Sequence, residues 1–351
     1  MNFSAWAGGL PEYMATTGIA PVAYDIFVGL PLDLNDMYWL AEILPQIAKV
    51  KAVLVVTLEP SGGLPAVTSA SVLQLATVMR AYEMQGVSFL VRFAHEMNGA
   101  WYPWGQQPAA YVAAFRMVAS IIHNNTCGAQ MLWAPNNGYG YPWPFYAHAP
   151  TMIRNQQLLA AKPGTANYVA MDTNGDSVVD NLDDPYEPYY PGDASVDWVG
   201  MSVYHVGGAD PRSPNVYDVN TSPGLREFSS LFSGGAHDFY GPYAAARNKP
   251  MSITETAALW NPAPDSRASA PSELQVKSLW WEQVLNAGSD TTNALSLATH
   301  FPLIKMTHWF DYMKARPTGA DGWSSPNIGT AKAKPLSELE EHMCRSVNAS
   351  K

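Results

Sequence analysis

The chain has 351 residues, of which 47% are hydrophobic and 14% charged, so it can bury a full core and is too apolar for a disordered protein. Its net charge of -10 argues against a nucleic-acid-binding protein, because contact with phosphate backbones needs a basic face. No apolar stretch reaches the roughly 18 residues that predict a membrane-spanning helix. The 12 Trp and 18 Tyr favour a carbohydrate ligand, since sugar rings stack on aromatic faces.

Short apolar runs alternate with helix-like segments along the chain, which predicts βα units. The predicted helices include residues 71–85 and 109–124, and the first shows helical spacing at Leu73, Ala76, Met79, Arg80 and Glu83. The predicted strands start near Phe3, Ala23, Ala52, Ser88, Gln130, Trp198, Met251 and Lys305.

Eight such alternations predict an α/β protein with a (β/α)8 TIM barrel, in a single domain over residues 1–351. An open doubly wound sheet is the alternative. Neither the GxGxxG nor the GxxxxGK[ST] phosphate loop is present, which argues against the usual nucleotide-binding functions of open sheets. Residues 139–150 and 183–191 are rich in proline and aromatic residues and are predicted to be long loops beside the site.

The most informative segment is 91–105, VRFAHEMNGAWYPWG, in which an apolar strand runs directly into a polar and aromatic loop. Arg92, His95, Glu96 and Asn98 crowd the end of this strand, where each would need a buried partner if it had no function. In a TIM barrel, residues at the carboxyl ends of the strands face the substrate. A purely structural polar network at the barrel mouth is the other interpretation.

A second glutamate, Glu255, ends the short apolar strand at residues 249–256, KPMSITET. Two glutamates from different strands are suited to the cleavage of a glycosidic bond. One must keep its proton as the acid while the other stays ionised as the nucleophile, and in retaining enzymes the carboxyl groups lie about 5–5.5 Å apart. Arg92 and His95 are candidates for separating the two pKa values.

The segment from Arg92 to Gly105 resembles the R-x-x-H-E-M-N-G-x-W-x-x-W-G signature of glycoside hydrolase family 26, whose members are (β/α)8 barrels. The likeness continues at residues 132–136 (LWAPN), 197–204 (DWVGMSVY), 254–255 (TE) and 308–314 (HWFDYMK). These segments follow one another over most of the chain.

The resemblance implies a retaining reaction with Glu96 as acid/base on strand 4 and Glu255 as nucleophile on strand 7. It also implies that Arg92 and His95 support the sugar before the cleaved bond and that Tyr204 donates a hydrogen bond to the nucleophile. The other expected substrate-binding residues are Asn98, Trp101, Trp104, Asn136 and Trp309, with Trp309 as the principal stacking surface.

The resemblance places an endo-β-1,4-mannanase first among the expected activities. Family mannanases commonly carry Trp-Phe-Trp-Trp in this loop, whereas residues 101–104 are Trp-Tyr-Pro-Trp, which looks more like the glucan-active branch. An endo-β-glucanase acting on mixed-linkage β-1,3-1,4-glucan is therefore the alternative, with xylan a third option. A barrel that binds polysaccharide without cutting it is a further alternative, because fold does not settle function.

Residues 172–183, DTNGDSVVDNLD, carry oxygen ligands at the spacing of a calcium-binding loop. The predicted ligands are Asp172, Asn174, Asp176, Asp180 and Asp183. The glycine stands at the fourth position instead of the sixth, so a solvated acidic loop is the alternative. We expect no cofactor to be required for catalysis, and any Ca²⁺ to be structural.

His95-Glu96 opens like a zinc protease motif, but the second histidine is replaced by Gly99, and no G-x-S-x-G elbow is present. The two cysteines, Cys127 and Cys344, could form one bridge. Asn-x-Ser/Thr sequons begin at Asn2, Asn124, Asn220 and Asn348. We expect a secreted, glycosylated monomer whose signal peptide has been removed, with a polysaccharide or oligosaccharide as substrate and no nucleic-acid or membrane partner.

Overall fold

The computed structural model describes residues 9–18, 20–142, 161–207, 220–260, 270–285 and 297–310. Seven strands form one sheet in the order in which they follow one another along the chain, and every neighbouring pair is parallel. They are β1 (Ala23–Gly29), β2 (Val53–Glu59), β3 (Ser88–Phe93), β4 (Gln130–Trp133), β5 (Trp198–His205), β6 (Met251–Ala258) and β7 (Ile304–Trp309). Each matches a predicted strand. The predicted strand near Phe3 lies outside the described residues.

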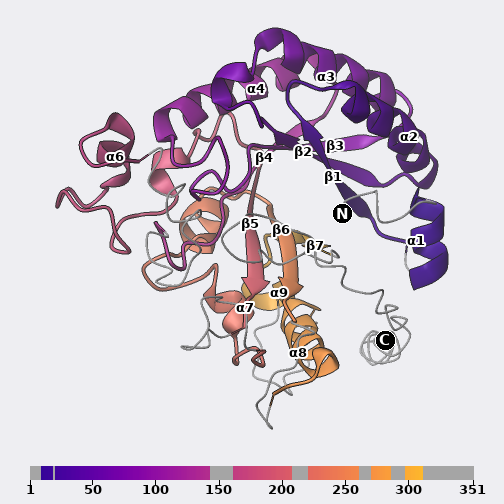
Figure 1. The fold of residues 1–351 in the computed structure, drawn as a ribbon. Helices are drawn as coiled ribbons and strands as arrows, with labels where there is room; N and C mark the ends of the chain where they lie inside the picture. Colours follow the sequence, from indigo (N-terminus) through magenta and orange to yellow (C-terminus); the bar gives the residue numbers. More distant parts are fainter. Residues whose placement is uncertain are drawn as a thin grey trace, which may run out of the picture.

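The sheet curls, and its first and last strands, β1 and β7, approach each other. This arrangement confirms the predicted α/β fold of the barrel type over the described part of the chain. It differs from an open doubly wound sheet, in which chain order reverses at a switch point. Figure 1 shows the helices of the N-terminal half on the outer side of the sheet and β5 to β7 below them.

The helices are α1 (Gly9–Thr17), α2 (Leu34–Val50), α3 (Ser69–Glu83), α4 (Pro108–Asn125), α6 (Ala166–Met171), α7 (Glu227–Ser230), α8 (Glu273–Leu285) and α9 (Leu297–His300). Short 3-10 turns occupy Leu64–Ala66 and Glu187–Tyr189, and a π-helical turn occupies Tyr240–Ala245. No described helix is both long and apolar enough to span a membrane.

The long helices begin where the sequence supplies caps. Asp33 caps α2 and Thr68 caps α3, and in both cases the residue three positions later bonds back to the cap, which satisfies amides left free at a helix start. The two predicted helices are confirmed as α3 and α4. Leu73 is 46% exposed, because the buried face of α3 runs through Val72 and Leu75.

Side chains alternate across each strand, so the two faces of the sheet bury different groups. The larger core lies between the sheet and the helices. A separate, smaller apolar cluster fills the inner face with Val53, Val55, Leu90, Leu132, Ala134, Trp198 and Met306. The inner face is therefore closed by apolar side chains below the carboxyl ends of the strands, where the site residues lie.

Candidate active site

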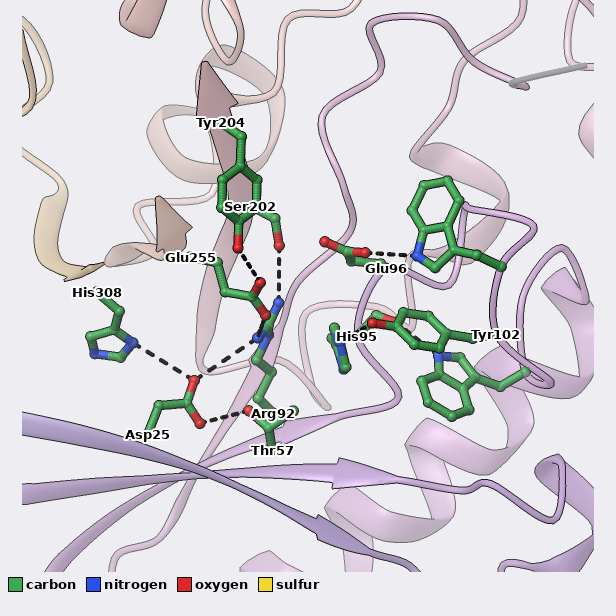
Figure 2. A network of polar contacts seen from close by, with 12 residues as sticks. Asp25, Thr57, Arg92, His95, Glu96, Tyr102, Ser202, Tyr204, Glu255 and His308 are labelled. Atoms are coloured by element: carbon green, nitrogen blue, oxygen red, sulfur yellow. Dashed lines mark hydrogen bonds and ion pairs between the residues drawn. The ribbon is translucent and has the colours of Figure 1, made fainter. Parts of the chain in front are cut away.

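On three strands of the sheet, the inner face has a polar residue two positions after a residue of the apolar cluster. Val55 is followed by Thr57 on β2, and Leu90 by Arg92 on β3, in the same direction along the sheet. On β7 the corresponding pair is Met306 and His308. Because residues two apart on a strand share a face, these polar side chains form a layer directly above the apolar cluster. Figure 2 shows this layer together with the two glutamates.

Glu255 is held on β6 by two donors that come from other strands. The Arg92 guanidinium lies on β3 and places its Nη1 2.6 Å from Glu255 Oε1, as a buried ion pair. The hydroxyl of Tyr204 on β5 donates to Glu255 Oε2 at 2.5 Å. Arg92 also donates from Nη2 to Ser202 Oγ at 3.1 Å, which fixes the plane of the guanidinium. Both carboxylate oxygens of Glu255 are therefore engaged and their direction is set.

Glu96 stands just beyond β3 on a loop with an unusual backbone. Its φ is 53°, a left-handed conformation that non-glycine residues seldom adopt, and its N–H donates to Ala134 O at 2.9 Å. The Trp101 indole N–H donates to Glu96 Oε2 at 2.8 Å. No ion pair to Glu96 is found among the described residues. Its carboxyl group points into the same space as that of Glu255 (Figure 2).

The two glutamates have opposite pKa shifts. Burial raises the pKa of Glu96, and the negative charge of Glu255 raises it further. Burial also raises the pKa of Glu255, but the charge of Arg92 and the hydrogen bonds from Tyr204 and Arg92 outweigh it and hold that pKa well below its usual range. Near neutral pH the site therefore keeps Glu255 ionised and favours a proton on Glu96.

His95 belongs to a compact aromatic wall beside these carboxylates. Its Nε2 lies 3.1 Å from the hydroxyl of Tyr102, and Tyr102 stacks on Trp104 with ring centroids 4.4 Å apart. Burial and the charge of Arg92 lower the pKa of His95 to about 3, so its ring is neutral. The loop closes tightly, because a Cβ on Gly105 would lie 2.1 Å from Gly99 O.

Two expected substrate-binding residues turn out to support the loops. Trp104 is only 1% exposed and its indole N–H donates to His95 O at 2.8 Å, so it does not offer a stacking surface. Asn98 is fully buried, and its side chain binds both the N–H and the carbonyl of Asn136. The Asn98 amide and the Trp104 indole N–H are thus already bound within the protein and are not offered to a sugar. Asn136 itself is only partly buried.

Trp309 lies at the end of β7 and is partly exposed. One face of its ring stacks on Trp281 of α8, with centroids 4.0 Å apart and 18° between the planes. A ring fixed in this way on one side is suited to bind a sugar on the other. Trp101 is also partly exposed, so it combines a contact with Glu96 and an accessible indole.

The predicted calcium ligands are not gathered around a common point by the loop at 172–183. The oxygens of Asp172 accept from Gly175 N and Ser177 N, and those of the buried Asp183 accept from Thr173, Asn174 and Asp180. Asp176 and Asn174 accept from amides two residues later. The carboxylates thus bind loop amides, and the described residues contain no group of three His, Cys, Asp or Glu side chains that could hold a metal. This arrangement does not fit the predicted ligand set, and calcium stays a prediction.

Sequence reasoning missed three polar residues of the inner layer: Asp25 on β1, Thr57 on β2 and Ser202 on β5. Thr57 Oγ1 donates to Asp25 Oδ1 at 2.8 Å, and all three are buried. The available signal was the charge of Asp25 inside the apolar strand AYDIFVG, because a buried carboxylate needs partners. Thr57 and Ser202 gave no comparable signal, since small hydroxyl residues are ordinary in strands.

Several other predictions can be placed only in part. Cys127 is exposed, whereas Cys344 lies outside the described residues, as do the sequons at Asn2 and Asn348. Asn124 is exposed, but Asn220 is buried and so is inaccessible to a glycan in this fold. Residues 143–150 of one predicted loop and residues 311–314 of the family-like segment are likewise outside the described residues.

Two carboxyl groups with opposite pKa shifts thus lie at the mouth of a curled parallel sheet, the pairing of acid and nucleophile that glycoside hydrolases need. Comparison with known families agrees: residues 28–147 match the model of glycosyl hydrolase family 26. This match confirms the resemblance over the part of the chain that contains Glu96, and it supports glycoside hydrolase activity. No curated protein matches the chain.

Solved structures include similar chains at low identity. A double mutant of the Cellulomonas fimi endo-β-1,4-mannanase is 14% identical with a TM-score of 0.48, covering 94% of this chain and 64% of that one. The catalytic domain of a Bacillus sp. JAMB-750 endo-β-1,4-mannanase is 16% identical with a TM-score of 0.45, covering 85% and 69%. A triple mutant of the Xanthomonas axonopodis pv. citri endo-β-1,4-glucanase is 12% identical with a TM-score of 0.46, covering 92% and 86%. This chain therefore spans 64% of the length of the Cellulomonas fimi protein.

Proposed function

We propose that the protein is a retaining glycoside hydrolase that cleaves internal β-linkages of a polysaccharide. The observation that supports this most directly is the difference between the two glutamates. Arg92 and Tyr204 bind Glu255 and favour its ionised form, whereas no cation pairs with Glu96 among the described residues and its pKa is raised. A retaining glycosidase needs this division between a nucleophile and an acid.

In the first step, a carboxylate oxygen of Glu255 attacks the anomeric carbon while Glu96 donates its proton to the departing glycosidic oxygen. The bond to the leaving sugar breaks with its electron pair on that oxygen, and a glycosyl ester with Glu255 forms. In the second step, ionised Glu96 takes a proton from water, which attacks the same carbon and releases Glu255. The configuration of the anomeric carbon is retained because it is inverted twice.

Around this centre, Tyr204 and Arg92 direct Glu255, and Trp309, which is partly exposed and stacked on Trp281, supplies a stacking surface for a sugar. His95 is neutral and directed by Tyr102, so it can exchange hydrogen bonds with sugar hydroxyls without carrying charge. No metal or cofactor takes part in either step.

The substrate class is a β-linked polysaccharide, with β-1,4-mannan as the first candidate because of the resemblance to family 26. Mixed-linkage β-1,3-1,4-glucan is the second candidate, and Tyr102 favours it. Tyr102 binds His95 and packs on Trp104, so the departure from the mannanase pattern at this position lies in the wall beside His95. The proposed enzyme is secreted and acts as a monomer.

The test is product release from galactomannan, glucomannan, barley β-glucan, xylan and laminarin by the wild type and by Glu255→Ala. We expect the wild type to cleave one of these internally, with the first product in the retained configuration by NMR. Glu255→Ala should lose at least about 10³-fold in rate while keeping the fold, as checked by circular dichroism, since it removes the nucleophile and leaves the packed core in place.

The matched control is Glu273→Ala, which removes an exposed glutamate of α8 that pairs with Lys277 and, among the described residues, bonds to neither Glu96 nor Glu255. It should keep full activity. Wild-type cleavage with inversion would exclude Glu255 as nucleophile. If neither protein cuts any polymer but one polymer retards the wild type in an affinity gel, the chain is a binding barrel and the proposed reaction is wrong.

A further inference from the structure

A second carboxylate approaches Arg92 from below the site. Asp25 on β1 places Oδ2 3.9 Å from Arg92 Nη1, the same nitrogen that binds Glu255 at 2.6 Å. Arg92 is fully buried, and the Asp25 side chain is 7% exposed. One buried positive charge is thus shared between two carboxylates, at unequal distances. Figure 2 shows Asp25 on the side of Arg92 away from Glu96.

Asp25 has a second titratable neighbour, His308 on β7. Asp25 Oδ2 lies 3.9 Å from His308 Nδ1, and the His308 side chain is 10% exposed. Among the described residues, Asp25 Oδ2 has no hydrogen-bond partner, and the His308 ring faces the backbone of Thr254. Buried polar atoms are rarely left in this state, and each such case needs a reason. The reason here is electrostatic, because this oxygen faces the Arg92 guanidinium and the His308 ring, each at 3.9 Å.

The protonation of this pair changes in the acidic range. Burial raises the pKa of Asp25 to about 6, against the lowering effect of the Arg92 charge. Burial and the charge of Arg92 lower the pKa of His308 to about 4. Asp25 therefore gains a proton as the pH falls through about 6, while His308 is still neutral. Asp25, next to Arg92, therefore changes from negative to neutral near pH 6, where hydrolysis of a glycoside can be measured.

We propose that Asp25 is a positioning residue that shares the positive charge of Arg92 with Glu255 and thereby sets the pH range of the reaction. His308 is a neutral ring beside Asp25. The inference rests on the proposed function, because it concerns the same two glutamates. Asp25 touches no substrate and acts only through Arg92.

The groups that face Asp25 come from four strands, and their charges fix the sign of its effect. Thr57 of β2 donates to Oδ1, and His308 of β7 is neutral. Within the described part of the chain, Arg92 of β3 is the only cation that acts on Asp25, and Glu59 of β2 and Glu255 of β6 are the anions. Ionised Asp25 adds a negative charge near Glu96 and disfavours its ionised form. Glu255 titrates well below the pH at which Asp25 loses its proton, so this charge leaves its pKa in place. Removing the charge therefore lowers the pKa of Glu96 alone.

The first variant is Asp25→Asn, which keeps the acceptor for Thr57 and removes the charge. We expect the basic limb of the profile of kcat/KM against pH, which Glu96 sets, to move to lower pH by about half a unit to one unit, as one charge at this separation implies. The acidic limb should stay in place, because Asp25 is already protonated at the low pH where Glu255 titrates. The control is Thr57→Ser, which keeps the hydroxyl and removes a methyl group beside Asp25. It should leave both limbs in place.

Trapping with a 2-fluoroglycosyl fluoride, made from the sugar that the wild type releases, separates the two proposals. The good leaving group needs no acid, so the rate of trapping reports the ionisation of Glu255 alone. If the wild type is not trapped and releases no product, the proposed function fails. If the wild type is trapped but Asp25→Asn loses rate equally at all pH values with both limbs unmoved, Asp25 is merely structural.

A direct titration applies even if Asp25→Asn does not fold. In the wild type labelled with ¹³C at its carboxyl groups, one buried aspartate should titrate near pH 6, and a glutamate signal should shift in the same range. A set of buried aspartates that all remain ionised from pH 4 to pH 8 would overturn the inference.

Discussion

Glu96 and Glu255 carry the same functional group, yet the chain holds them in different ways. Glu255 lies within β6, with donors reaching it from β3 and β5, so three strands fix its position. Glu96 lies on the loop after β3, in a left-handed conformation anchored by its N–H on Ala134. Glu255 on the strand is thus bound by the cation Arg92, whereas Glu96 on the loop accepts a hydrogen bond from the indole of Trp101.

The difference teaches how a single buried arginine separates two pKa values. Of the two glutamates, Arg92 binds only Glu255, and the resulting anion raises the pKa of Glu96 across the site. Burial alone would raise both pKa values and leave two neutral acids. The backbone of Glu96 is costly, since a non-glycine residue at positive φ loses about 1 kcal/mol or more, and such strain often marks a functional position.

The largest effect on this comparison should come from removing the acid. Glu96→Ala is expected to lower the rate by about 10²–10⁴-fold on substrates with poor leaving groups, because these need a proton on the departing oxygen. Aryl glycosides with acidic phenols need none and should retain most of their rate in the first step. The measurement is kcat/KM across a series of aryl leaving groups.

Added azide sharpens the test. In Glu96→Ala it should restore turnover and yield a glycosyl azide of retained configuration, since azide can attack the ester of Glu255 without a general base. An equal loss of rate for every leaving group in the series would remove Glu96 from the role of acid.

A smaller effect is expected on the other side, from Tyr204→Phe. The variant deletes the hydroxyl that donates to Glu255 Oε2 and leaves the ring in place. Because that bond favours the ionised carboxylate, its loss raises the pKa of Glu255 and moves the acidic limb of kcat/KM to higher pH. A fall of about tenfold is expected at the pH optimum, as one hydrogen bond to a charged group implies. A shift of the limb in the opposite direction would contradict this orientation of the bond.

The same comparison shows what the sequence can and cannot predict. The strand order, the two glutamates and the residues Arg92, His95 and Tyr204 follow from apolar runs with polar ends and from a long motif. Trp104 was assigned to the substrate because a motif does not say which of its aromatic residues turns inward, and that depends on the path of the loop through Gly99 and Gly105.

The inner layer illustrates a second limit. Asp25 and Ser202 meet Arg92 only because three strands have one particular register, and register is a property of the whole sheet. The exposed position of Leu73 has a similar origin. Helical spacing gives the period of α3 but not its phase, which packing against the sheet decides.

The smallest effect should come from Trp101→Phe, and it tests the Glu96 side without touching the acid itself. The indole N–H donates to Glu96 Oε2, a bond that favours the ionised form and lowers the pKa of Glu96. Phenylalanine keeps an aromatic face and cannot donate, so the pKa of Glu96 rises and the basic limb of kcat/KM moves to higher pH by about half a unit to one unit. The matched control is Tyr102→Phe, which loses its bond to His95 and makes no hydrogen bond to Glu96. The acidic limb should stay in place in both variants, because Glu255 keeps Arg92 and Tyr204. A basic limb that moves equally in Trp101→Phe and Tyr102→Phe would assign the shift to the aromatic wall as a whole and not to the indole donor.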